Sequence, residues 1–210
     1  MAYENFEKLP EEKQQLILST GIKAFAQNSY KDVSTDYITK ACGISKGILF
    51  HYFGSKKDYY LYCLEKSMQR LIGNKEPITG NDFYDILFTS MNQKMAQCMV
   101  YKDEMHMVNM ASRDPSVDVA EGKDEILRRY RTVMQLRSAQ TLQRAMTKLE
   151  LKKTVNRQTT AEGLQLYINA VLNKYLLQYQ QAPDRFFENS DAIKAEMKGY
   201  LDLMLKGVCR

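Results

Sequence analysis

Apolar residues recur at helical spacing along almost the whole chain. Leu18, Ile22 and Phe25 lie at i, i+4 and i+7 and predict a helix over about residues 10–28. The same spacing predicts helices in later stretches. These cover about residues 55–72, 81–100, 103–111, 116–151 (with Gly122 as a candidate interruption), 159–181 and 190–206. The pattern therefore predicts an all-α protein.

Two short helices with their own caps are predicted between residues 33 and 54. Ser34, Ser45 and Ser55 each precede a helical stretch and suit the N-cap position, where a hydroxyl accepts a backbone N–H. Gly43 lies between the first two stretches and can adopt the positive φ that ends a helix. A helix, a tight glycine turn and a second helix form the helix-turn-helix arrangement, in which the second helix enters a major groove of DNA.

Basic side chains gather in this region. Between residues 40 and 57 there are four lysines and no acidic residue, so the segment carries +4 of the chain's formal charge of +5. The lysines are Lys40, Lys46, Lys56 and Lys57. A local excess of this kind favours attraction to phosphates.

The second short helix divides into two faces. Ile44, Leu49 and Phe53 share one side and are predicted to pack inward. The residues predicted at its start and outer face are Lys46, Gly47, Ile48, Phe50, His51 and Tyr52. For Ile48 and Phe50 a core position is the alternative, because helical phase could turn either side chain inward.

The run ACGISKGILFHYFGSKKDYYLY, residues 41–62, resembles the N-terminal signature of the TetR family of one-component bacterial repressors. The resemblance implies that Lys46, Gly47, Ile48 and Phe50 face base edges, and that phosphates are contacted by His51, Tyr52, Lys56, Ser34 and Thr35. Ile48 and Phe50 depart from the family pattern, in which threonine and tyrosine are usual. The departures remove two hydroxyls and leave apolar contact, for instance with thymine methyl groups, as the available readout.

The last two predicted helices each carry an apolar stripe, which could be intrachain core or a dimer interface. The resemblance implies a homodimer, and one short helix contacts too few bases, so two copies about 34 to 36 Å apart are expected on DNA. The predicted interface consists of Leu164, Ile168, Val171, Leu172, Tyr175, Tyr179, Ile193, Met197, Tyr200, Leu201 and Met204.

Six methionines fall between residues 91 and 110, and their flexible side chains suit either an apolar ligand pocket or ordinary core packing. Together with the arrangement usual in the resembled family, helical phase predicts an effector cavity. Its predicted lining is Phe88, Met91, Met95, His106, Met110, Met134 and Tyr167. A ligand there would shift the helix at residues 55–72 and lower affinity for the operator.

The cysteines, the histidines and the hydropathy of the chain argue against several classes of function. The four cysteines are widely spaced and the two histidines belong to no known metal or catalytic motif, so no metal, cofactor or enzyme activity is predicted. The polar N-terminus and the lack of a long apolar run predict a cytoplasmic protein without a membrane partner.

The expected organisation is a helix-turn-helix domain (1–54), a linking helix (55–72) and a larger effector-binding and dimerisation domain (73–210). The predicted function is a homodimeric repressor that binds a double-stranded DNA operator and is released by a small apolar or amphipathic ligand. An activator, a regulator without a ligand, and a helical protein-interaction module are the alternatives.

Overall fold

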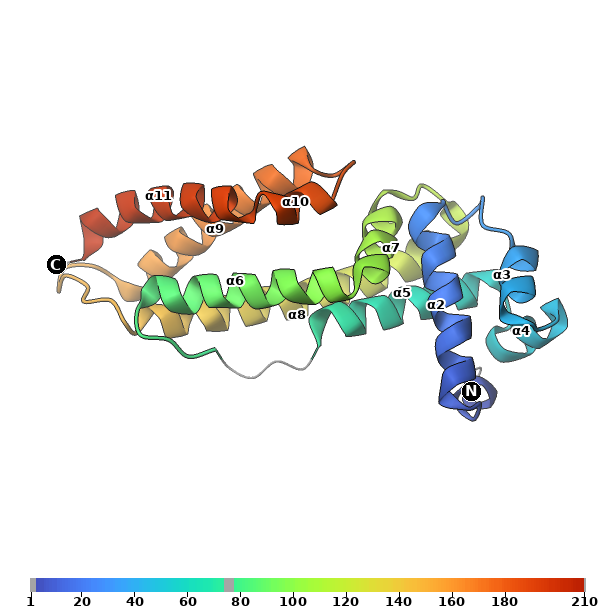
Figure 1. Ribbon diagram of the computed structural model, residues 1–210. Coiled ribbons are helices and arrows are strands. Elements are labelled where there is room, and N and C mark those ends of the chain that lie inside the picture. The colour runs from blue at the N-terminus through green and yellow to red at the C-terminus, as the bar shows by residue number, and fades with distance from the viewer. Residues whose placement is uncertain (1–2, 74–77, 210) are drawn as a thin grey trace. The chain divides into compact units, whose positions relative to one another are not determined.

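The protein is helical throughout the part that the computed structural model describes, residues 3–73 and 78–209 (Figure 1). Those residues form eleven helices and no strand, with one isolated bridge between Leu151 and Cys209. The helices are α1 (Glu4–Glu7), α2 (Glu11–Gln27), α3 (Thr35–Cys42), α4 (Lys46–Phe53), α5 (Lys56–Ile72), α6 (Phe83–Val100), α7 (Lys102–Arg113), α8 (Val117–Met146), α9 (Arg157–Gln178), α10 (Asp184–Glu188) and α11 (Ser190–Val208). The all-α prediction is confirmed.

Three details of the helix prediction are wrong. The short helices α1 and α10 were not predicted, because four or five residues are too few to show a helical period. α8 continues through Gly122 without interruption. A Cβ atom at Gly122 would lie 2.6 Å from Cδ1 of Leu61 in α5, so this glycine allows close packing and does not end the helix.

The predicted caps of the helix-turn-helix are present. The Ser45 hydroxyl accepts the Ile48 N–H at 3.2 Å, and the Ser55 hydroxyl accepts the Asp58 N–H at 3.1 Å. Gly43 has φ 61°, and the Ile44 N–H donates to the Thr39 carbonyl at 3.0 Å, which closes the end of α3. The local sequence therefore determines where α3 ends and where α4 and α5 begin.

Contacts divide the chain into two compact units. The first unit comprises Met1–Gly73 and Gln97–Thr132, and the second comprises Asn74–Ala96 and Val133–Arg210. The predicted boundary between residues 72 and 73 lies next to residues 74–77, which are outside the described residues. The functional division into 1–54, 55–72 and 73–210 stays a prediction, whereas packing adds α7 and the start of α8 to the first unit.

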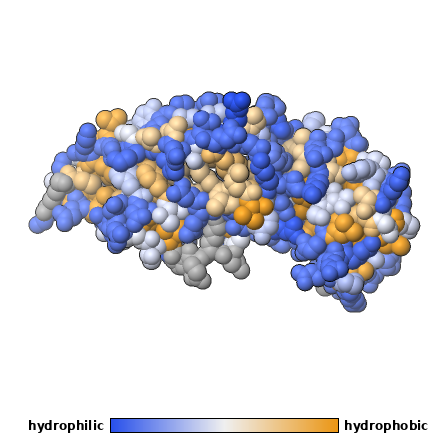
Figure 2. Space-filling view, viewed as in Figure 1, coloured by the Kyte–Doolittle hydropathy of each residue, from blue (hydrophilic) through white to orange (hydrophobic). Residues whose placement is uncertain are grey.

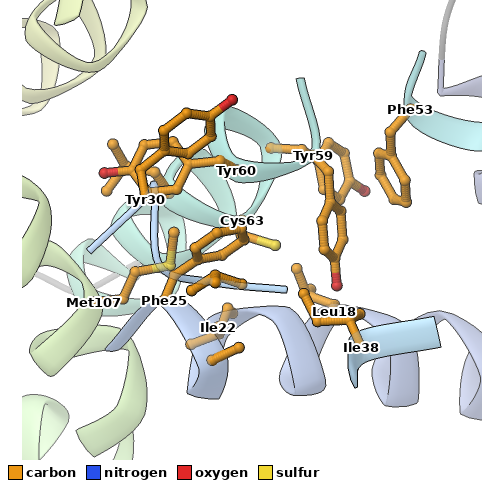
Figure 3. Packing of buried hydrophobic residues seen from close by; sticks show 14 of the residues in the cluster. Leu18, Ile22, Phe25, Tyr30, Ile38, Phe53, Tyr59, Tyr60, Cys63 and Met107 are labelled. Atoms are coloured by element: carbon orange, nitrogen blue, oxygen red, sulfur yellow. The ribbon is translucent and has the colours of Figure 1, made fainter. Parts of the chain in front are cut away.

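The first unit has an aromatic core in which α2 contacts α3, α5 and α7 (Figure 3). Tyr59 of α5 is fully buried, and its hydroxyl donates to the Ile17 carbonyl of α2 at 2.6 Å. The Phe53 ring at the end of α4 lies 4.7 Å from the Tyr59 ring. A Cβ at Gly21 would lie 2.2 Å from the Tyr59 hydroxyl oxygen, so α2 and α5 approach closely only because residue 21 is glycine. This core holds the helix-turn-helix against α5.

The second unit packs α9 along α11, and this changes the interpretation of the predicted dimer interface. The fully or almost fully buried members of that prediction are Leu164, Ile168, Val171, Ile193, Met197 and Leu201. Leu172, Tyr175 and Met204 are partly buried against the same cluster. These side chains are covered within their own chain, so the alternative of an intrachain core holds for them. Tyr179 is half-buried and Tyr200 is exposed.

Candidate DNA-binding surface

The outer face of α4 is open to solvent, and its inner face is closed. Lys46, Gly47 and His51 are exposed and Ile48 is 42% exposed, whereas Leu49 and Phe53 are fully buried. The structure therefore places Ile48 outside the core, which favours the predicted apolar readout over the alternative core role. The first turn of α4 begins at Ser45 and presents an exposed lysine and a glycine, a combination that can approach base edges and phosphates closely.

Two aromatic residues of α4 are only partly exposed and can offer only part of their surface to DNA. Phe50 and Tyr52 are half-buried, and the Tyr52 ring meets the Phe6 ring edge to face at 6.0 Å. Tyr52 therefore helps to attach α4 to the core, although part of its surface remains open for the predicted phosphate contact.

The beginning of α3 differs in part from the prediction. Ser34 is exposed, and its hydroxyl accepts the Tyr37 N–H at 3.5 Å. Thr35 is only 7% exposed, so little of this residue is open to a phosphate. The reason is that Thr35 faces the interior in the first turn of α3. Tyr37, in contrast, is 66% exposed at the start of α3, and it is not among the residues predicted to contact DNA.

An acidic side chain lies inside the predicted binding surface. Asp36 Oδ1 is 3.0 Å from Lys46 Nζ, and the two side chains are 72% and 51% exposed. An ion pair this open to solvent contributes little stability, on the order of 0.2–1 kcal/mol. It can therefore open readily, so Lys46 remains available to DNA.

The unpredicted helix α1 reaches the recognition helix. Phe6 is buried, and its ring lies 4.8 Å from the Phe53 ring. The neighbouring Asn5 amide nitrogen is 3.2 Å from Nε2 of His51, a predicted phosphate contact. Tyr3, Phe6 and Leu9 lie three residues apart, but three apolar positions are too few to establish a helical period.

Lys56 lies at the edge of the same surface. Its ammonium group is 4.7 Å from the centre of the Tyr30 ring and donates to the Lys31 carbonyl at 3.3 Å. Burial lowers the pKa of Lys56, and this is partly opposed by the charges of Asp32 and Asp114. These contacts give the side chain a defined position before any DNA arrives.

The predicted effector residues are divided between the two units. Phe88, Met91, Met95, Met134 and Tyr167 belong to the second unit, whereas His106 and Met110 belong to the first. Phe88 and Met91 pack on the core of the second unit. Tyr167 is 44% exposed, and its ring stacks on that of Tyr200 at 6.2 Å.

A surface groove of about 320 Å³ in the first unit has a different lining, which includes none of the predicted effector residues. It is lined by Phe6, Gln14, Gln15, Leu18, Tyr62, Lys66, Gln69 and Arg70. Within the described ranges, no cluster of three or more metal-binding side chains occurs. No helix among residues 3–73 and 78–209 has the length and hydropathy needed to cross a membrane.

Comparison with known proteins agrees with this geometry. Residues 17–62 match the family model for bacterial regulatory proteins of the tetR family. The uncharacterised HTH-type transcriptional regulator YuxN of Bacillus subtilis is 40% identical over 68 residues, which are 30% of this chain and 23% of YuxN. The chain thus matches less than a quarter of the length of that relative.

Two solved structures resemble almost the whole chain. A TetR family regulator from Chloroflexus aurantiacus has a TM-score of 0.57 at 22% identity and covers 99% of this chain and 98% of its own. The flavonoid-responsive regulator FrrA has a TM-score of 0.59 at 17% identity, with coverage of 95% and 98%. At such low identity the likeness shows the fold.

A capped, exposed and basic helix after a glycine turn defines a helix-turn-helix DNA-binding protein. The matched region, residues 17–62, includes α3 and α4 completely and most of α2. The N-terminal region of the chain thus matches the DNA-binding domain of the TetR family, and almost the whole chain has the fold of solved TetR family regulators.

Proposed function

We propose that this regulator is a homodimeric repressor that binds a pseudo-palindromic operator and is released by a small apolar or amphipathic ligand. The observation that carries the DNA-binding part is the exposure of Lys46, Gly47, Ile48 and His51 on one face of α4, above the buried Leu49. Repression, as opposed to activation, is proposed from the family.

DNA binding is tested with labelled DNA from upstream of the protein's own gene and with a scrambled duplex of equal length. The double variant Lys46→Gln, Lys56→Gln should bind both more weakly. The log–log slope of affinity against salt should flatten by about one unit for each phosphate that the variant no longer neutralises. Lys153→Gln is the matched control, because Lys153 is an exposed lysine of the second unit. An unchanged slope in the double variant would remove both lysines from the interface.

A second copy of the chain needs an uncovered apolar face, and α9 and α11 have one. Leu166 and Leu177 of α9 are 70% and 73% exposed, and Leu203 of α11 is 70% exposed. Figure 2 shows that hydrophobic patches interrupt the hydrophilic surface on the side in view. We propose that the dimer contact includes this exposed face, because most side chains of the predicted interface are covered within their own chain.

Release by a ligand is supported by the fold shared with FrrA, a regulator described as flavonoid-responsive. In this chain, Met95, Met110 and Met134 are half-buried, and side chains of that type adapt to varied apolar ligands. A flavonoid is therefore a reasonable first probe. Loss of bound operator when it is added would support induction, and unchanged binding across a panel of apolar compounds would argue for a regulator without a ligand.

The alternatives predict different results in the same assay. A helical interaction module or an enzyme would show no preference for the upstream DNA over the scrambled duplex. An activator would bind the upstream DNA and raise transcription from it in a purified system. A repressor would lower that transcription.

A further inference from the structure

The turn between α7 and α8 contacts the loop that leads into the helix-turn-helix. Asp114, in this turn, is 4% exposed. Its Oδ2 accepts the backbone N–H of Tyr30 at 2.5 Å, and its Oδ1 accepts the N–H of Ser116 at 2.8 Å. Tyr30 and Asp114 are 84 residues apart in the sequence, and both belong to the first unit. One buried carboxylate therefore joins two distant segments.

Asp114 is itself firmly held. Lys123 of α8 is 7% exposed, and its ammonium group donates to the Asp114 carbonyl at 2.6 Å. Burial alone would raise the pKa of Asp114. Hydrogen bonds from Ser116 and Tyr30, together with the charge of Lys123, outweigh burial and hold this pKa below its usual value. The carboxylate is thus charged at neutral pH and makes charge-assisted hydrogen bonds, which are stronger than neutral ones.

From Tyr30 the contacts continue to the DNA-binding surface. Tyr30 is 8% exposed, and its ring packs edge to face on the Tyr60 ring at 5.3 Å. On the Tyr30 ring lies the ammonium group of Lys56, 4.7 Å from its centre, and the same group donates to the carbonyl of the next residue, Lys31. The loop then runs to Ser34, which caps α3.

We propose that Asp114 is a positioning residue for DNA binding, which holds the loop at Tyr30 from the α7–α8 turn and thereby places Lys56 and the start of α3 against the phosphate backbone. This inference rests on the proposed function. It adds a defined connection between the α7–α8 turn and the reading helices, beyond the direct link through α5.

The connection also suggests how a ligand signal would reach the DNA-binding surface. The Asp114 N–H donates to the carbonyl of Met110, a predicted effector residue, at 3.0 Å. A displacement of the last turn of α7 would therefore move Asp114, and Tyr30 would lose its acceptor or follow it. Either change would displace the Lys56 ammonium group, which lies on the Tyr30 ring.

The test compares Asp114→Asn with Asp118→Asn in the full chain. Asparagine at 114 can accept only one of the two N–H groups, since its amide NH₂ cannot accept. Asp118 is exposed, and its charge acts on Tyr30, so it is a matched charge control without the hydrogen bond. Three quantities are measured: hydrogen exchange at the Tyr30 amide, affinity for upstream and scrambled DNA, and the salt slope of that affinity.

We expect the Tyr30 amide to exchange at least tenfold faster in Asp114→Asn, and DNA affinity to fall about tenfold with a salt slope flatter by about one unit, as when one phosphate is no longer neutralised. Asp118→Asn should leave exchange and slope unchanged. A purely structural role would lower the folded fraction without changing the slope. Lys56→Gln should mask most of the effect of Asp114→Asn on affinity when the two are combined.

Full additivity of the two substitutions, or an unchanged Tyr30 exchange rate, would overturn the inference. If wild type shows no preference for upstream DNA, the proposed function fails, whereas the exchange result still reports on the hydrogen bond itself. If Asp114→Asn does not fold, Lys123→Gln replaces it, because it loosens Asp114 and leaves the carboxylate intact. The exchange rate of the Tyr30 amide and the salt slope of DNA affinity then test the inference in that variant.

Discussion

At the residue scale, Asp114 makes stability depend on pH in a defined direction. Its folded pKa lies below the ordinary aspartate value, so its contribution to stability is fully present above that value and is lost as pH falls through the folded pKa. Asp114→Asn should lower the free energy of unfolding by about 1–3 kcal/mol near neutral pH, because a buried N–H loses its acceptor.

The difference between wild type and Asp114→Asn should shrink as pH falls below about 4, the ordinary range of an aspartate pKa. Urea unfolding at a series of pH values, as far as the fold persists, measures this. Asp118→Asn serves again as the control, because its carboxylate is exposed. A difference that stays constant across the series would mean that the charged form of Asp114 has no special stabilisation.

At the element scale, α1 closes the aromatic cluster beneath α4. Phe6 is 1% exposed, and its ring contacts those of Phe53 at 4.8 Å and Tyr62 at 5.5 Å. Phe6→Ala should lower the free energy of unfolding by about 3–5 kcal/mol, the usual cost of removing a buried phenylalanine ring. Because α1 also carries Asn5, its hydrogen bond with His51 should break at the same time.

Thermal unfolding and DNA affinity of Phe6→Ala test this role of α1. Lys8→Ala is the control on the same segment, since Lys8 is exposed. Wild-type stability in Phe6→Ala would show that α1 is not packed on α4 in solution. Reduced stability together with unchanged DNA affinity of the folded protein would separate the core role of Phe6 from the positioning of His51.

At the scale of the whole molecule, the proposed dimer depends on the outer face of α9 and α11. Leu177→Glu combined with Leu203→Glu should give a monomer with unchanged helix content, because both side chains are exposed within the chain. Operator affinity should fall strongly, since each monomer reads only one half-site. Light scattering coupled to gel filtration measures the mass.

Leu136→Glu is the control for this experiment, because Leu136 is 60% exposed on α8 and lies outside the proposed contact. A double variant that remains dimeric would move the interface elsewhere. A wild-type monomer on DNA would remove the homodimer from the proposed function altogether.

Whether a feature could be predicted from the sequence depends on how far apart along the chain the interacting residues lie. Ser45 caps α4 through Ile48, and Gly43 ends α3 through its own φ, so both are decided by residues at most a few positions away. The buried Leu49 and exposed Lys46 follow from helical phase within α4. For the same reason helix type, the helix-turn-helix and its basic charge were predictable from the chain alone.

Only the tertiary structure decided which apolar face is covered and which distant groups meet. Periodicity shows that α9 and α11 have an apolar stripe, but not that their own chain buries Leu164 and Met197 and leaves Leu203 outside. The Asp114 contact to Tyr30 spans 84 residues and the Asn5 contact to His51 spans 46. Such contacts depend on how whole helices pack, and no local pattern encodes their partners.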